Sequence, residues 1–171
     1  MGGALIQVYT GNGKGKTTAA LGMAMRAAGA GKKVYICQFL KGRFCCELAS
    51  LKKLKNIKIE QFGTRRFIRK APGAIDAKMA KEALEAARKA IKTKQCDIII
   101  MDELNAALRL GLIKLKDVLE LIGGAPKKIE LVITGRDAPS EIIERADLVS
   151  EIREVKHYFR KGVRARRGIE F

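Results

Sequence analysis

An eight-residue stretch near the start of the chain combines glycine, lysine and threonine at a spacing suited to holding phosphate groups. The stretch is Thr10-Gly11-Asn12-Gly13-Lys14-Gly15-Lys16-Thr17. Glycines let the backbone curl so that successive N–H groups point at one anion. Lys16 can place a charge on the outer phosphates, and the Thr17 hydroxyl can ligate Mg²⁺.

The residues on either side of this loop predict the elements that position it. The apolar run at 4–9 predicts a buried strand, and residues 18–26 predict a helix. A helix N-terminus adds its dipole and unpaired N–H groups to an anion site. Thr10 stands where the consensus loop has its first glycine, and a turn that merely joins strand to helix is the alternative. The flanking pattern favours phosphate binding.

Two acids, Asp102 and Glu103, end a near-continuous apolar run at 96–103. Mg²⁺ in proteins is bound by one or two carboxylates together with phosphate oxygens. We therefore expect Thr17, Asp102 and Glu103 to form a metal site. The alternative is that Asp102 caps the helix predicted at 104–110. The phosphate loop in the same chain favours the metal role.

Two further side chains are candidates for roles at the site. Arg136 follows an apolar run at 129–134 and could clamp a phosphate or a ribose. Its alternative role is an ion pair with Asp137 or Glu141. His157, the only histidine, could act as an acid or base, but in a basic segment it is more typical of a solvated or packing residue.

Strand and helix patterns alternate along the chain, which predicts an α/β fold with a mostly parallel sheet and helices on both faces. We expect a single nucleotide-binding domain over 1–171 with a basic C-terminal tail at 153–171. The predicted strands are 4–9, 33–39, 57–62, 96–103, 129–134 and 147–152, and the predicted helices are 18–26, 47–54, 74–93, 104–110, 115–122 and 140–145. Three polar clusters, at 11–17, 102–103 and 135–137, follow strand ends and should converge at one edge of the sheet.

The longest predicted helix, at 74–93, has an amphipathic pattern. Its expected inner face consists of Ile75, Met79, Ala83, Ala86, Ala87 and Ala90.

Composition narrows the function classes. The 171 residues carry 35 Lys and Arg against 18 Asp and Glu, a net charge of +17. That charge would attract nucleic acid or a nucleotide triphosphate, although a solvated lysine-rich surface is the favoured interpretation.

No apolar run reaches the roughly 18 residues of a membrane span, and the first residues do not have the pattern of a secretion signal. The four cysteines lack zinc-site spacing, so we expect a reducing, cytoplasmic setting.

The loop, including its non-glycine start, resembles that of the ATP:corrinoid adenosyltransferases. The similarity continues through most of the chain in the same order. The matching segments are QFLKG at 38–42, MDELN at 101–105, TGRDAP at 134–139, ADLVSE at 146–151, VKH at 155–157 and GIEF at 168–171.

The resemblance implies a RecA-like P-loop NTPase fold and a defined reaction. The enzyme would transfer the 5′-deoxyadenosyl group of ATP to Co(I) of a reduced corrinoid and release triphosphate, in adenosylcobalamin biosynthesis or salvage. It also implies Mg²⁺ or Mn²⁺, a homodimer and a reducing flavoprotein as partner, with nucleic acid not expected.

The resemblance also implies roles for individual residues. The catalytic set would be Lys16, Thr17 and Glu103, and the metal ligands would be Thr17, Asp102 and Glu103. ATP would be bound by Gly11, Asn12, Gly13, Lys14, Gly15, Lys16, Thr17, Thr18 and Arg136. Some relatives carry a Phe–Trp pair against the corrinoid. This chain has no Trp, so Phe62 and Phe67 are the candidates to line that cleft.

The runner-up is a RecA-like ATPase acting on nucleic acid, and a third class is a nucleotide-binding regulator without catalysis. In an ATPase, Glu103 could position water and Arg136 could act as an arginine finger. The residues alone leave this open. The C-terminal segments favour the transferase, because a general ATPase has no reason to carry them.

Overall fold

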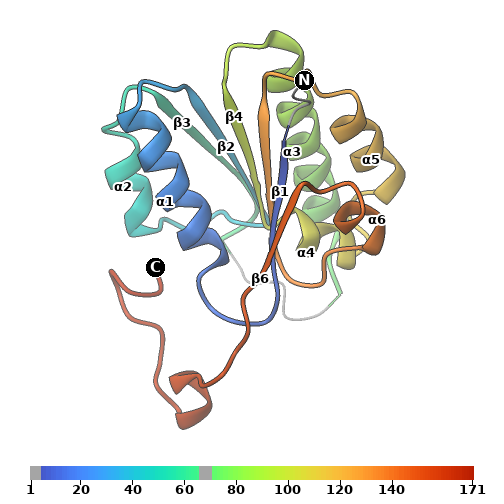
Figure 1. The fold of residues 1–171 in the computed structure, drawn as a ribbon. Coiled ribbons are helices and arrows are strands. Elements are labelled where there is room, and N and C mark those ends of the chain that lie inside the picture. Colours follow the sequence, from blue (N-terminus) through green and yellow to red (C-terminus); the bar gives the residue numbers. More distant parts are fainter. Residues whose placement is uncertain (1–4, 66–70) are drawn as a thin grey trace.

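A six-stranded sheet lies between two layers of helices in the computed structural model, which describes residues 5–65 and 71–171 (Figure 1). Strands and helices alternate as predicted. In chain order the elements are β1 (Ile6–Thr10), α1 (Lys16–Gly29), β2 (Val34–Phe39), α2 (Cys46–Leu51), β3 (Ile57–Phe62), α3 (Ala74–Thr93), β4 (Ile98–Asp102), α4 (Leu104–Arg109), α5 (Leu115–Gly123), β5 (Glu130–Thr134), α6 (Ser140–Ile143), β6 (Leu148–Glu151) and the 3₁₀ helix η1 (Tyr158–Lys161).

The strand order is β3-β2-β4-β5-β1-β6, and each of these neighbouring pairs is parallel. The predicted α/β class is confirmed. Gln38 of β2 pairs in register with Asp102 of β4, and Tyr9 of β1 pairs with Thr134 of β5. Because the strands run in the same direction, the segments that follow β1, β2, β4 and β5 lie at one edge of the sheet.

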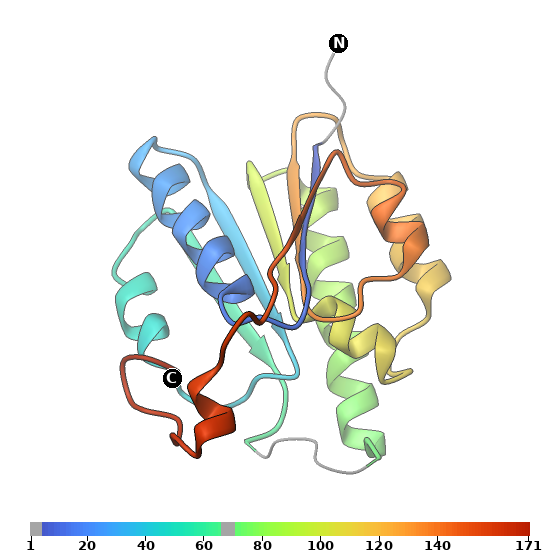
Figure 2. The same ribbon diagram turned by 60° about the horizontal axis from the view of Figure 1, so that its bottom comes forward.

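Two cores cover the two faces of the sheet. On one face, α1 and α2 pack Ala20, Ala24 and Leu51 against the strands. On the other face lie α3, α4, α5 and α6, as Figure 1 and Figure 2 both show. Strands β2 and β4 are buried along their whole length, which explains their near-continuous apolar sequences.

The inner face of α3 differs from the prediction. Its buried residues are Ala80, Ala83, Leu84, Ala87 and Ile91, whereas Ile75 is 61% exposed. The prediction for Ile75 is wrong because repeated steps of four residues rotate by about 40° per step around a helix of 3.6 residues per turn. Over three such steps the stripe leaves the face that meets the sheet.

After β6 the chain returns to the loop between β1 and α1. Figure 1 and Figure 2 both place this C-terminal segment, with η1 in it, beside that loop. Gly13 N–H donates to the Ile152 carbonyl at 2.7 Å, which joins the two segments. Within the described residues, no helix is long and apolar enough to cross a membrane.

Candidate active site

The loop between β1 and α1 is folded around the side chain of Lys16. The Lys16 ammonium donates to the carbonyls of Gly11 and Gly13, each at 2.7 Å, and the residue is only 7% exposed. Burial lowers the pKa of Lys16, while the negative charge of nearby Glu103 opposes that shift. The loop therefore holds a positive charge next to the N-terminus of α1, where an anion is stabilised.

Close packing explains two of the loop glycines. Gly11 has φ of 97°, and a Cβ there would lie 2.5 Å from the Ile152 carbonyl oxygen. At Gly13 a Cβ would lie 2.7 Å from the Arg153 carbonyl oxygen. These glycines thus let the chain after β6 pass directly against the loop, in addition to shaping the loop itself.

Asp102 is the centre of a buried polar cluster at the ends of β2, β4 and β5. Its Oδ1 accepts from the hydroxyls of Thr17 at 2.8 Å and Thr134 at 2.6 Å. Its Oδ2 accepts from Gln38 at 3.0 Å and Lys41 at 2.7 Å. Although burial raises the pKa of the Asp102 carboxyl, the Lys41 charge and these hydrogen bonds hold it below its usual range. The carboxylate is therefore charged and fully satisfied.

Glu103 occupies the N-cap position of α4 with φ of 62°, and its N–H donates to the Thr134 hydroxyl at 3.0 Å. The alternative that Asp102 caps this helix is therefore wrong. Burial, together with the Asp102 charge, raises the pKa of the Glu103 carboxyl. The pKa of Asp102 is thus lowered and that of Glu103 raised, although the two acids are adjacent in sequence.

The side-chain oxygens of Thr17 and Asp102 suit a divalent cation, because they already contact a positive group, the Lys41 ammonium. The Lys41 ammonium lies 3.2 Å from Thr17 Oγ1 and 2.7 Å from Asp102 Oδ2. In the described part of the chain no group of three His, Cys, Asp or Glu side chains could enclose a metal alone. Further ligands would have to be phosphate oxygens and water, which is the usual pattern for Mg²⁺.

Arg136 is exposed and lines a cavity of about 380 Å³ beside the loop. The residues that line this cavity are Asn12, Arg136, Glu151, Arg153, Glu154 and Arg160. The expected ion-pair partners of Arg136 are engaged elsewhere: Asp137 pairs with Arg109 at 3.3 Å, and Glu141 accepts from Ser140. Neither of the two ion pairs expected for Arg136 is therefore formed in the described residues, and the acids Glu151 and Glu154 share the cavity with it.

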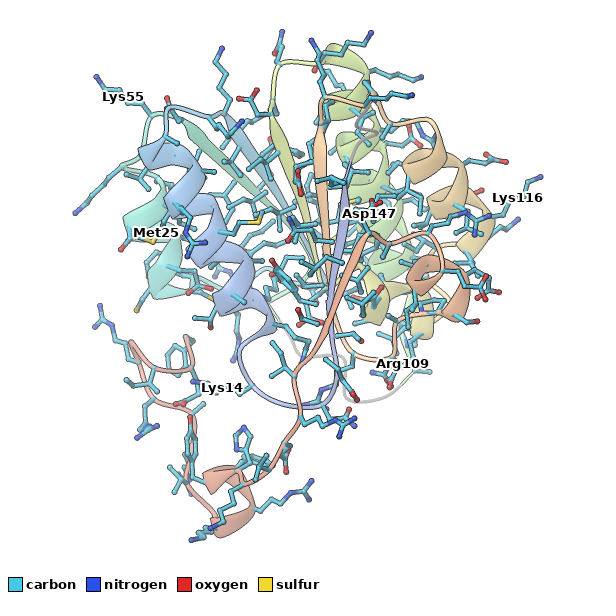
Figure 3. All side chains as sticks on the ribbon, viewed as in Figure 1. Lys14, Met25, Lys55, Arg109, Lys116 and Asp147 are labelled. Atoms are coloured by element: carbon cyan, nitrogen blue, oxygen red, sulfur yellow. The ribbon has the colours of Figure 1, made fainter. Side chains whose placement is uncertain are left out.

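The side chain of Lys14 points away from the loop and binds the end of the chain (Figure 3). Its ammonium donates to the Ile169 carbonyl at 3.0 Å and pairs with Glu170 at 3.4 Å. Glu170 also accepts from the Arg166 backbone at 2.7 Å and from the Tyr158 hydroxyl. The Arg166 and Tyr158 hydrogen bonds lower the pKa of Glu170 to about 2.

The remaining candidates lie in different surroundings. His157 Nδ1 accepts from Phe159 N–H at 3.1 Å and caps η1, which agrees with the packing alternative. Phe62 is partly buried and packs against the core at the end of β3. Thr18 is exposed in the first turn of α1. Phe67 falls outside the described residues.

Sequence reasoning missed Gln38, Lys41 and Thr134 as parts of the site. Gln38 and Thr134 are fully buried polar residues at the ends of apolar strands. A buried polar residue in an apolar strand needs a hydrogen-bond partner. The polar residues Gln38 and Thr134 within apolar runs could therefore have indicated a polar cluster at the strand ends. Asn105, also fully buried, donates to the Gly135 carbonyl at 3.3 Å and was missed as well.

Comparison with known proteins identifies one family. The family model described as ATP:corrinoid adenosyltransferase BtuR/CobO/CobP matches residues 3–171. The corrinoid adenosyltransferase of Escherichia coli strain K12 is 35% identical over 167 residues, covering 98% of this chain and 85% of that protein. The corrinoid adenosyltransferase CobA of Salmonella typhimurium is 33% identical over 167 residues, with the same coverage of both chains.

A third relative, the corrinoid adenosyltransferase of Pseudomonas aeruginosa, is 35% identical over 169 residues, covering 98% of this chain and 83% of that protein. The matches extend over the loop, the Asp102 cluster and the C-terminal segment alike. The family inferred from the sequence motifs is confirmed. This chain belongs to the ATP:corrinoid adenosyltransferase family.

Proposed function

We propose that the protein transfers the 5′-deoxyadenosyl group of ATP to Co(I) of a reduced corrinoid and releases triphosphate. The reaction would serve adenosylcobalamin biosynthesis or salvage. The observation that carries this proposal is the match to the adenosyltransferase family across residues 3–171 in a chain whose loop encloses Lys16.

The reaction is a displacement at C5′ of ATP. The Co(I) electron pair forms the cobalt–carbon bond, and the C5′–O5′ bond breaks. Triphosphate leaves with that electron pair, and cobalt becomes formally Co(III). Because Co(I) carries no proton, this step requires no general base. The protein must instead align cobalt with C5′ and stabilise the charge on the departing triphosphate.

The residues at the loop suit that second task. Lys16 and the loop N–H groups at 11–12 and 14–18 would bind the phosphates, because the Gly13 N–H already donates to Ile152. Arg136 would contact the anion from the lining of the adjacent cavity. Thr17, Asp102 and Glu103 would hold Mg²⁺ or Mn²⁺. A metal ion bound there supplies positive charge beside the leaving group.

Other parts of the proposal rest on family resemblance. Phe62 and Phe67 are proposed to line the corrinoid cleft, a reducing flavoprotein to supply Co(I), and two copies of the chain to form a homodimer. We also propose that residues 1–171 act as one domain with the tail at 153–171. The four free cysteines support a cytoplasmic setting.

The nucleic-acid ATPase was supported by the net charge of +17. The family match favours the transferase over it, since the relatives are named for corrinoid adenosylation.

An anaerobic assay with ATP, Mg²⁺ and chemically reduced cob(I)alamin tests the proposal. Absorbance would follow the cobalt–carbon bond, and chromatography would identify the phosphate product. Lys16→Met should lose at least about 100-fold in rate, because it removes the charge facing the triphosphate. Lys78→Met removes a surface lysine that pairs with Glu82 on α3, away from the loop, and should match the wild type. Equal rates for the two variants would contradict the role of Lys16.

A further inference from the structure

Lys41 is a partly buried cation at the site, and the reaction described above does not use it. Its side chain is 24% exposed, and its partner Asp102 is 1% exposed. The ammonium contacts Asp102 Oδ2 at 2.7 Å and Thr17 Oγ1 at 3.2 Å. Both oxygens belong to residues assigned above to the metal site. The ammonium therefore touches the atoms that a divalent cation would ligate.

The backbone around Lys41 is built to hold it there. Leu40 has φ of 59°, and its N–H donates to the Phe62 carbonyl at 2.9 Å. A Cβ on Gly42 would lie only 2.0 Å from the Gly63 carbonyl oxygen. The loop after β2 thus crosses the loop after β3 at a contact that only glycine permits. This crossing fixes the direction from which Lys41 reaches Asp102.

The Lys41 ammonium balances the charge of the Asp102 cluster. Asp102 accepts four hydrogen bonds, and Lys41 is the only charged group among the four donors in the described residues. A divalent cation ligated by Thr17 and Asp102 would stand against this ammonium in a poorly solvated site. If the Lys41 ammonium and the metal ion both contacted these oxygens, the two cations would lie close together and repel strongly. The metal ion and the ammonium therefore cannot share these oxygens.

We propose that Lys41 is a resident counter-cation that holds Thr17 and Asp102 in place while the metal is absent and is displaced when a divalent cation binds with nucleotide. The inference rests on the proposed function in taking these oxygens as the metal site of an ATP-using enzyme. Metal binding without nucleotide is then weak, because the metal must first break the Lys41–Asp102 contact. ATP helps by supplying phosphate oxygens to the metal and an anion for the freed ammonium.

Titration with Mn²⁺ in the absence of nucleotide tests this directly, with free Mn²⁺ measured by electron paramagnetic resonance. Lys41→Met keeps the length of the side chain and removes the competing charge. We expect it to bind Mn²⁺ at least about tenfold more tightly than the wild type. Lys78→Met, the surface control on α3, should leave the affinity unchanged. An affinity for Lys41→Met equal to or weaker than that of the wild type would overturn the proposal.

A second measurement uses the wild-type chain, in case Lys41→Met does not fold. Nitrogen-15 labelling of lysine side chains makes the Lys41 ammonium visible by NMR, and Lys41→Arg assigns its signal by loss. We expect this signal to shift between ATP with a chelator and ATP with Mg²⁺. The same Lys41 signal in both samples would show that the ammonium stays in place, and would overturn the proposal.

Failure of this inference is distinguishable from failure of the proposed function. Neither measurement contains a corrinoid, so both report on Lys41 whether or not a cobalt–carbon bond forms. Unchanged Mn²⁺ binding would remove the role of Lys41 and leave the transferase intact. If no cobalt–carbon product forms but Lys41→Met binds Mn²⁺ more tightly, the transferase proposal fails and the displacement of Lys41 by the metal stands.

Discussion

The hydroxyl of Thr17 donates to the carboxylate of Asp102 at 2.8 Å, although the two residues are 85 positions apart in the chain. This bond joins the N-terminus of α1 to the end of β4. It places Thr17, the residue that follows Lys16, beside a buried, charged acid. A nucleotide held by the loop would therefore have the proposed metal ligands already positioned.

We expect Thr17→Val to weaken the binding of ATP in the presence of Mg²⁺ by about 10 to 100-fold, because it removes one proposed metal ligand and the bond that orients Asp102. Thr17→Ser keeps the hydroxyl and should bind within a few-fold of the wild type. Isothermal titration calorimetry with ATP, with and without Mg²⁺, measures the difference. Retained Mg²⁺-dependent affinity in Thr17→Val would exclude Thr17 as a ligand.

Asp102→Ala should lower the free energy of unfolding by about 3 kcal/mol, because it leaves the partly buried Lys41 without its partner and three hydrogen bonds unmade. Glu82→Ala breaks the exposed pair with Lys78 and should cost less than about 1 kcal/mol. Urea unfolding of the two variants makes the comparison. Similar midpoints would mean that the Asp102 cluster adds little to stability.

Gly13→Ala should disrupt the contact between the loop and the segment after β6, since its Cβ would lie 2.7 Å from the Arg153 carbonyl oxygen. We expect a loss of about 1–3 kcal/mol in stability and at least about tenfold weaker ATP binding. Gly22 lies inside α1 and meets nothing within 4 Å. Gly22→Ala should raise stability by about 0.5–1 kcal/mol, and an equal effect of both substitutions would refute the packing argument.

The attachment of the C-terminal segment should depend on the charge of Glu170. Hydrogen bonds from Arg166 and Tyr158 lower the pKa of this carboxyl from its ordinary value of 4.5 to about 2. A lowered pKa means that the stabilisation is fully present above about pH 4.5 and is lost as pH falls toward 2. The attachment should therefore survive mild acid.

The amide proton of Arg166 reports this titration, because it donates to Glu170 Oε2 at 2.7 Å. Its NMR chemical shift should change with a midpoint near pH 2 and should not titrate in Glu170→Gln. A midpoint near 4.5 would indicate that Glu170 does not hold the segment in solution.

Local sequence patterns predicted the parts of the site that one strand–loop–helix unit carries. Lys16 and Thr17 followed from the loop, and Asp102 followed from an apolar strand that ends in acids. Gln38 and Lys41 were missed because their role depends on β2 lying next to β4 in the sheet. Strand patterns reveal which segments are strands, but the order of strands depends on how all the helices pack.

The same limit applies to the tail. Lys14 and Ile169 are 155 positions apart, and only the completed fold brings them together. The sequence predicted a basic tail at 153–171, and the structure adds that its end is tied to the loop through the Lys14–Glu170 pair.

The most direct test of the central claim is a single turnover under anaerobic conditions, with cob(I)alamin limiting and ATP and Mg²⁺ in excess. We predict one cobalt–carbon bond and one triphosphate for each cobalt consumed, and no phosphate product when cob(I)alamin is omitted. Formation of ADP and phosphate at a rate independent of cob(I)alamin would contradict the transferase.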